Sequence, residues 1–258
     1  MALQERYANL AMAKLRATSV LTNLFNHKYE GDPKCGAVKV PVRSEATVGD
    51  YVIATGGAIN HTQTTYATLN IDKDKFVNEV VDGYEADAVP DNIVAERLDS
   101  CGYALANTED ITLSALLKTK GTKFTPTKTG VYGEITEAIS KLKKKHIKVQ
   151  NMWLLVSVDY ELEIINDANF IKASAMGDSV MMNGQIGKIG GVPVILCDNM
   201  PASTSFILGN NIFCSCVDEW KVAPHVVGLA NEFIGASAVQ GRFVFGADVL
   251  DATTVLYK

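Results

Sequence analysis

The chain lacks the features that would mark it as a nucleic-acid-binding, membrane-spanning or exported protein. Its 258 residues contain 24 lysines and arginines against 29 aspartates and glutamates, and the net charge of −5 provides no basic excess to neutralise phosphates. No apolar run approaches the roughly 20 residues of a membrane span. Charges interrupt the apolar positions of the N-terminal MALQERYANLAMAKLR, which is therefore neither a signal peptide nor a transit peptide. The remaining class is a globular protein, long enough for one large domain or two closely packed ones.

Metal-binding cysteine patterns are also absent. The five cysteines are an odd number without a CxxC pair, and the four histidines are dispersed along the chain. These residues are Cys35, Cys101, Cys197, Cys214 and Cys216, with His27, His61, His146 and His225. A zinc site needs cysteines and histidines at ligand spacing, so none is expected. We expect reduced thiols that serve as small apolar packing groups in a protein assembled in the cytoplasm.

Catalytic motifs are missing as well. The chain contains no GxSxG, HExxH, GxxxxGK(S/T) or DFG pattern. Asp159, Glu161 and Glu163 lie at the start of a short predicted helix, where acidic side chains favour the helix dipole. Asp72 and Asp74 are predicted to make a turn and salt bridges, because the ligand spacing of an EF-hand is absent. We therefore expect no catalytic, cofactor-binding or metal-binding residues, and a protein that is not an enzyme.

Glycines are concentrated in residues 175–201, AMGDSVMMNGQIGKIGGVPVILCDNMP. The spacing within Gly184–Gly191 superficially resembles a phosphate loop, which leaves a nucleotide-binding enzyme as a remote alternative. A phosphate loop, however, follows a buried parallel strand and opens directly into a helix. Here residues 185–189 alternate between polar and apolar, and 192–196 form a second strand. The pattern predicts a short helical segment, a β-hairpin whose glycines set backbone geometry, and a loop.

The first seventy residues predict an arm followed by a long β-excursion. Residues 1–28 are predicted to be mostly helical. Residues 38–42 alternate as a strand, with Pro41 at an edge because it cannot donate to a ladder, and 64–71 alternate as the returning strand. Both faces are polar, with few large apolar anchors. Such a hairpin is only marginally stable within a monomer, so it is either floppy or held by another subunit.

Two amphipathic helices follow. Pro90 and Asp91 are predicted to begin a helix over 91–118, about 40 Å long at 1.5 Å per residue. Its stripe steps at intervals of four and three: Val94, Leu98, Cys101, Leu105, Thr108 and Thr112. A second apolar stripe, Ile135, Ala138, Ile139 and Leu142, ends in the lysine run 143–145. That run could be a nucleic-acid patch, but in an acidic chain it favours a solvated helix end.

The remaining segments are mostly strands. Residues 76–81 contain a compact apolar patch, Trp153 to Val158 predict a strand buried on both faces, and 159–166 a helix. Later strands are predicted at 206–208, at 212–217 and as a final pair within 236–257 that includes 242–245 and 254–257. The fold class is α+β.

The order of these elements resembles the major capsid proteins of tailed double-stranded DNA bacteriophages, which have the Hong Kong 97-type capsid fold. The segments behind the resemblance are TLNIDKDKFVNEVVDGYEADAV (68–89), the hairpin and loop NGQIGKIGGVPVILCDNMP (183–201), and the following strand with ILGN (207–210). The resemblance covers about 60–255 and depends on the ordered set of segments. It implies an N-terminal arm at 1–34, an extended loop at 35–70 that lies over a neighbouring subunit, and two domains.

The resemblance implies a peripheral domain at 71–124 and 236–258, with its spine helix at 91–118, and an axial domain at 125–235. It implies a function in self-assembly, with hexamers and pentamers closing an icosahedral virion shell around double-stranded DNA without sequence-specific contacts or a membrane. A separate scaffolding protein is expected because the chain begins at the arm. A portal and decoration proteins are further expected partners, and assembly is expected in the host cytoplasm. The nearest alternative is an encapsulin, a bacterial compartment shell of the same fold that encloses cargo enzymes.

Some capsid proteins of this group form a lysine–asparagine cross-link between subunits. Lys39 and the segment 60–75 contain candidate residues, but the sequence indicates no acidic environment for that chemistry. No cross-link is therefore expected.

Overall fold

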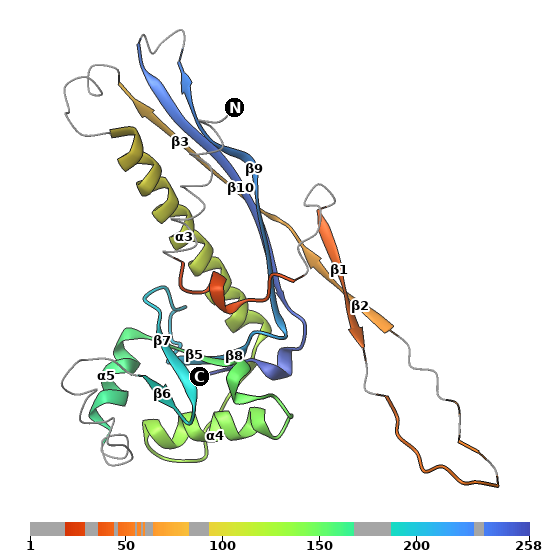
Figure 1. Cartoon of the computed structure of the whole chain (residues 1–258). Helices are drawn as coiled ribbons and strands as arrows, with labels where there is room; N and C mark the ends of the chain where they lie inside the picture. Colours follow the sequence, from red (N-terminus) through yellow and green to blue (C-terminus); the bar gives the residue numbers. More distant parts are fainter. Residues whose placement is uncertain are drawn as a thin grey trace.

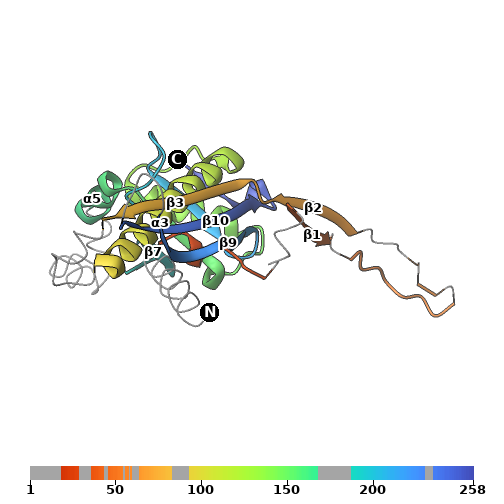
Figure 2. The ribbon, with the colours of Figure 1, turned by 90° about the horizontal axis from the view of Figure 1, so that it is seen from above.

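One long helix and three β-sheets determine the shape of the part of the chain that the structure describes (Figure 1). The computed structural model describes residues 19–28, 36–43, 46–54, 56, 57, 59, 64–82, 93–167, 187–229 and 235–258. The helix runs along one sheet and ends at a second, and a two-stranded arm projects from the region where they meet (Figures 1 and 2).

The first sheet has three antiparallel strands in the order β3-β10-β9. They are β3 (Lys73–Val81), β10 (Ser237–Val249) and β9 (Cys214–Gly228). The helix α3 (Ile93–Lys120) lies along one face of this sheet.

The alternation of side chains along β10 decides which face meets α3. Phe243 and Phe245 are buried against Leu105 and Ala106 of the helix. Arg242, immediately before Phe243, is exposed and donates to Asp74 of β3 at 2.8 Å. Burial of each large apolar side chain contributes about 1.5–3 kcal/mol, so the phenylalanines fix the register of helix and sheet.

The second sheet has six strands in the order β4-β11-β8-β5-β7-β6. These are β4 (Thr122–Lys123), β11 (Leu256–Tyr257), β8 (Phe206–Asn210), β5 (Met152–Val156), β7 (Val192–Leu196) and β6 (Lys188–Ile189). Two helices accompany it, α4 (Val131–Lys143) and α5 (Val158–Asn166). Short 3-10 turns lie at Thr22–Leu24 (η1), Val149–Asn151 (η3) and Ala252–Thr254 (η4).

The central strand β5 is buried along its whole length and belongs to two hydrophobic cores. Leu154 packs on the side of α4, in the core that includes Ile139. Leu155 points the other way and packs with Leu113 and Leu117 from the last turns of α3. A single helix therefore contributes to the cores of both large sheets.

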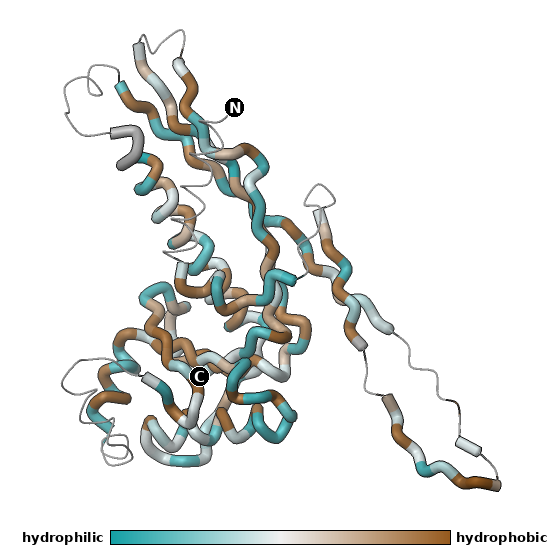
Figure 3. The backbone as a smooth tube through the Cα atoms, in the orientation of Figure 1, coloured by the Kyte–Doolittle hydropathy of each residue, from teal (hydrophilic) through white to brown (hydrophobic). Residues whose placement is uncertain are grey.

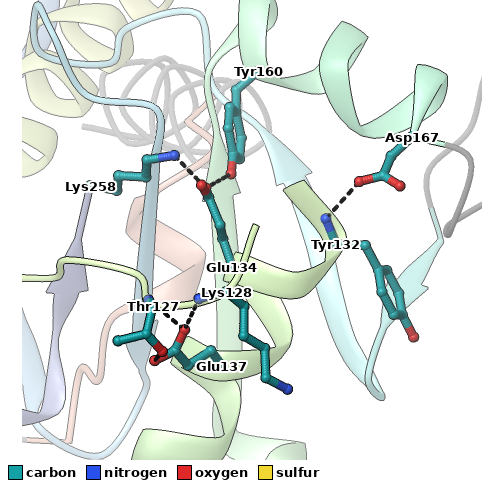
Figure 4. Close-up of polar contacts among 8 residues, drawn as sticks. All are labelled: Thr127, Lys128, Tyr132, Glu134, Glu137, Tyr160, Asp167 and Lys258. Atoms are coloured by element: carbon teal, nitrogen blue, oxygen red, sulfur yellow. Dashed lines mark hydrogen bonds and ion pairs between the residues drawn. The ribbon is translucent and has the colours of Figure 1, made fainter. Parts of the chain in front are cut away.

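Two glutamates of α4 hold neighbouring segments in place (Figure 4). Glu134 accepts a hydrogen bond from the hydroxyl of Tyr160 on α5 at 2.8 Å and forms an ion pair with the ammonium group of Lys258. Glu137 accepts the backbone N–H groups of residues 127–128 at 2.9 and 3.0 Å. These contacts hold α4, α5, the preceding loop and the last strand together as one unit.

The third sheet is the arm itself. Strands β1 (Ala37–Arg43) and β2 (Thr64–Asn70) pair antiparallel from Ala37 with Asn70 to Arg43 with Thr64. Figure 1 shows the arm extending away from both large sheets. The predicted pair of strands, with Pro41 in a two-stranded ribbon, is confirmed.

The two predicted helices are also confirmed. The helix predicted at 91–118 is described from Ile93 to Lys120, and all four predicted apolar positions of α4 are buried. The lysines that follow α4 are exposed, as predicted. Residues 1–18, the helix start at Pro90–Asp91 and the short helical segment predicted at the beginning of 175–201 lie outside the described residues.

Three predictions about strands were wrong. Phe76 and Val80 do not form a compact patch with Val77, because the period of two along β3 leaves Phe76 76% exposed and turns Val77 toward α3. The strand predicted to reach 158 ends at Val156, since the Ser157 hydroxyl caps α5.

The final strand pair is the third error. Leu256–Tyr257 does not pair with β10; it lies between β4 and β8 in the six-stranded sheet. The turn η4 and Asp251, which caps it, redirect the chain between the two strands.

The crossing of β10 and the base of the arm depends on Gly246. A Cβ atom at this position would lie 2.2 Å from the Asn70 carbonyl oxygen and 2.7 Å from the Ile71 Cα. Because both obstacles are backbone atoms, Gly246→Ala is expected to lower the free energy of unfolding by about 1–3 kcal/mol. Urea denaturation measures this change.

Gly228→Ala is the matched control. It lies at the end of β9, and a Cβ there meets nothing within 4 Å. We expect its free energy of unfolding to stay the same or to rise by up to about 1 kcal/mol. Equal stability of the two variants would contradict the close approach at Gly246.

Candidate functional site

The far end of the arm exposes large apolar side chains that no other part of the described chain covers. Among the described residues there, Val48, Ile53 and Ile59 are 93%, 94% and 91% exposed, and Tyr51 is 74% exposed. Figure 3 shows hydrophobic stretches at this end of the arm. Sequence analysis emphasised the small polar residues of this segment and missed these side chains, although YVI at 51–53 is visible in the sequence.

The backbone of the arm is equally unsupported. Beyond the ladder that ends at Arg43 and Thr64, the described residues add one isolated bridge, between Val52 and Gly56. An isolated two-stranded ribbon is marginally stable in water, and its open edges can pair with another chain. Exposed apolar groups on such a ribbon indicate an interaction surface. This surface is the candidate functional site.

The base of the arm, in contrast, is firmly attached to the body. Val40 of β1 and Leu69 of β2 are fully buried and pack with Val217 of β9. The Ile71 N–H donates to the Gly36 carbonyl at 3.0 Å and closes the ladder at this end. The arm is therefore fixed in direction at its root, whereas its far end lies in solvent. The sequence predicted that few large apolar side chains attach this hairpin to the rest of the subunit. That prediction holds only for the outer part of the arm.

A second feature ties the N-terminal segment to the long helix. Asp110 of α3 accepts the Ser19 hydroxyl at 2.7 Å and the N–H groups of Val20 and Leu21 at 3.0 and 3.1 Å. Further along, Asn26 exchanges backbone hydrogen bonds with Cys214 and Cys216 of β9 at 2.8 and 3.1 Å. Residues 19–26 thus connect α3 to β9 across the edge of the sheet.

Beneath this segment lies a cluster of buried carboxyl groups. Glu109 is fully buried, and Asp218, whose side chain is also buried, pairs with His27 Nδ1 at 3.2 Å. Burial raises the pKa of Glu109 to about 8, and the nearby Asp218 carboxylate adds to the effect. Sequence analysis missed this cluster. The sequence does contain an indication of it. Glu109 lies four positions from both Leu105 and Leu113, so it falls within the apolar stripe of the helix.

The glycine-rich segment forms a hairpin, as predicted. Gly190 and Gly191 have φ values of 59° and 88° and form the two-residue turn between the antiparallel strands β6 and β7. Positive φ at both turn positions is typical of a type I′ hairpin. Since no helix opens at this turn, the geometry of a phosphate loop is absent from the described part of the segment, Gly187–Gly191. Gly184 lies outside the described residues.

The other candidate residues have structural surroundings. Asp159 and Glu161 occupy the first turn of α5, and Asp74 pairs with Arg242. The four described cysteines are buried, in keeping with apolar packing, and burial raises the pKa of the Cys214 thiol to about 12. Cys35 lies outside the described residues.

Within the described part of the chain, no three acidic, histidine or cysteine side chains are grouped so that they could hold a metal ion. No helix among the described residues is both long and apolar enough to cross a membrane.

Comparison with known proteins places these features in context. A family model described as "Phage capsid protein" matches residues 51–257. A segment of 74 residues is 32% identical to the major capsid protein of Escherichia phage T5. That segment makes up 27% of this chain and spans only 16% of the T5 protein.

Solved phage structures resemble this chain over most of its length. A structure from Mycobacterium phage Che8 superposes with a TM-score of 0.74 and 21% identity, over 93% of this chain and 90% of that one. The capsid structure of cyanophage P-SCSP1u gives a TM-score of 0.74 at 12% identity, over 93% and 87%. At these identities the likeness shows a shared fold.

The buried Glu109 generates a prediction about pH. A carboxyl whose pKa rises from 4.5 to about 8 on folding keeps a proton that the unfolded chain loses within that interval. The free energy of unfolding therefore falls as pH rises through this window, by up to about 1.4 kcal/mol per pH unit, and the loss is complete above it. Glu109→Gln mimics the protonated form and should flatten this dependence. Urea denaturation across the window measures it.

Asp218, Asp110 and His27 face the same cluster and are present in both proteins, so the comparison isolates Glu109. Glu219→Gln, at an exposed acid on β9, is the control and should retain the pH dependence of the original chain. An unchanged slope in Glu109→Gln would contradict the raised pKa.

Proposed function

Because the chain belongs to the phage capsid protein family, we propose that it assembles into hexamers and pentamers that close an icosahedral head around double-stranded DNA. The protein is a major capsid protein of the Hong Kong 97-type fold, and its role is structural rather than enzymatic. The size of the assembly and its DNA content are the proposed part.

The apolar end of the arm is the observation that supports this proposal. Val48, Ile53 and Ile59 are more than nine-tenths exposed at the end of a two-stranded ribbon, where a second chain could cover them. In a closed lattice each arm lies on a neighbouring subunit, so its open edges and apolar side chains are satisfied in trans. Repetition over many subunits then turns weak contacts into a stable shell.

The proposed domains follow the resemblance, with a refinement from the strand pairing. Residues 1–34 are the N-terminal arm, 35–70 the extended loop, 71–124 and 236–258 the peripheral domain, and 125–235 the axial domain. Because β9 pairs with β10 along most of its length, 214–228 is better assigned to the peripheral domain. The strand β11 is better assigned to the axial domain, since it pairs with β8.

The proposed partners follow from charge and from the lattice. With a net charge of −5, the shell contains DNA without sequence-specific contacts. A separate scaffolding protein, a portal and decoration proteins are the other proposed partners, with assembly in the host cytoplasm and the virion as the final location. A compartment shell that encloses cargo enzymes is the alternative. Family membership favours the phage head, and analysis of purified shells for DNA or for enclosed protein separates the two.

Removal of the outer arm tests the proposal. Arg43 and Thr64 are paired in the ladder, so residues 44–63 can be replaced by a short glycine-containing turn without loss of the root. We expect a variant with near-original thermal stability, because the buried contacts of Val40 and Leu69 remain, but no shells by negative-stain electron microscopy.

A full-length control separates loss of length from loss of apolar contact. The triple variant Val48→Ser, Ile53→Ser and Ile59→Ser keeps the arm and removes only the exposed apolar groups. It should assemble less than the original chain at equal concentration. Normal shells from the deletion variant would show that the arm is not the assembly element.

A further inference from the structure

The outer side of α5 and the loop after β7 form one surface with an excess of negative charge, here called the acidic face. It contains Asp159 and Glu163 on α5 and Asp198 in the loop, and it surrounds a cavity of about 370 Å³. None of these three carboxylates forms an ion pair with another described residue. None of the described residues that line the cavity is basic, and Lys118 donates to the carbonyl of Ala202 at 2.6 Å.

The cavity also contains a polar atom that lacks a partner. Thr204 lines it and is only 6% exposed, yet its hydroxyl oxygen makes no hydrogen bond. No described residue bonds to this hydroxyl, and a buried hydroxyl without a partner is costly, so a donor that enters the cavity would be stabilised there. Beside the cavity, Val158 and Leu162 lie one turn apart on α5 and are 53% and 63% exposed. An apolar centre with a charged rim is the usual composition of a protein–protein interface.

The opposite charge gathers at the other end of the same part of the molecule. Lys143 ends α4, and Lys144 and Lys148 follow it, all exposed; we call these residues the lysine face. None of them forms an ion pair with a described residue. Beside them lies Ile212, which is 43% exposed in a turn held by the Asn211 N–H to Asn151 carbonyl bond of 3.0 Å. The lysine face therefore has the complementary composition.

The two faces lie at opposite ends of α4. The helix begins against α5, where the Tyr132 N–H donates to Asp167 at 3.1 Å and Glu134 accepts from Tyr160 (Figure 4). Its 13 residues then carry the chain about 20 Å away, at 1.5 Å per residue, to the lysine face. Complementary surfaces on opposite sides of one subunit can form head-to-tail contacts, which give rings when the rotation between subunits closes.

We propose that the acidic face of one subunit binds the lysine face of the next copy around each capsomer ring. A lysine side chain enters the 370 Å³ cavity, its ammonium group lies among Asp159, Glu163 and Asp198, and one N–H donates to the Thr204 hydroxyl. Val158 and Leu162 pack against the apolar surface near Ile212. This inference rests on the proposed assembly into rings and specifies the contact within them.

Charge reversal on each face tests the contact. The acid variant carries Glu163→Lys and Asp198→Lys, and the lysine variant carries Lys144→Glu and Lys148→Glu. Lys144 is the C-cap residue of α4, but it caps the helix through its backbone N–H, which the substitution keeps. In a ring made of either variant alone, like charges would face each other across every contact between neighbouring subunits. Sedimentation velocity should show that the concentration needed for association rises by more than about tenfold. Circular dichroism and thermal melts check that each variant is folded.

The chain with all four substitutions is the matched control. It carries the charges of both variants but restores opposite charges across the contact, and it should associate at nearly the original concentration. Equal assembly of the original chain and both single-face variants would overturn the proposal. A folded four-substitution chain that stays dissociated would also overturn it.

A mixture of the two single-face variants gives a further test. Opposite charges then meet only if the variants alternate around the ring, which is possible with six subunits and impossible with five. Electron microscopy of the mixture should show hexameric rings or sheets without pentamers. Pentamers in the mixture would contradict the contact.

Two other experimental results would have different meanings for the charge contact and for the proposed function. A lysine variant that forms normal shells but retains less DNA would assign the lysine face to nucleic acid and overturn the proposal. Failure of the original chain to form rings or shells would instead count against the proposed function, because the charge contact is judged only by the difference between variants and the original chain.

Discussion

The burial of one helix in two cores is the constraint on which the rest of the structure depends. Leu105 and Ala106 of α3 pack against the phenylalanines of β10, while Leu113 and Leu117 pack against β5. A helix of 28 residues is stable in water chiefly through such packing, so each sheet needs α3 and α3 needs both sheets. The two sheets are consequently held in a fixed relation. Surfaces at their far ends keep defined positions on the subunit, which is a requirement for a repeating contact.

Polar groups buried near α3 work differently from its apolar stripe. Asp110 fixes the N-terminal segment through three hydrogen bonds. Because these bonds satisfy the buried carboxylate, they stabilise one arrangement of the chain. Glu109, one position earlier, is buried among other carboxyl groups and lowers stability whenever it is ionised. Adjacent residues of one helix therefore have opposite energetic effects. The segment 19–26 lies directly over this pair, so its attachment responds to protonation while the hydrophobic cores do not.

Local patterns in the sequence were sufficient for some elements and insufficient for others. The stripe of α4 and the Gly190–Gly191 turn were predictable, because helix period and turn backbone depend on neighbouring residues. The place of β11 was not, since Leu256–Tyr257 pairs with strands about 50 and 130 residues earlier in the chain. The exposure of Phe76 depends on which face of β3 meets α3, and the burial of Glu109 depends on β9 lying over it. The apolar residues within 48–59 are visible in the sequence. Their exposure could not be predicted, because it depends on the arm projecting away from the body.

Among the described residues, the arm is the one sheet built from only two strands. Two-stranded ribbons have the largest twist of any sheet, because no third strand resists rotation about the ribbon axis. Its root is clamped by Val40 and Leu69, and its outer end has no such support. Torsional compliance is therefore confined to this ribbon, while the two cores joined by α3 remain stiff. One sequence can in this way fit neighbours at slightly different angles without any rearrangement of its interior.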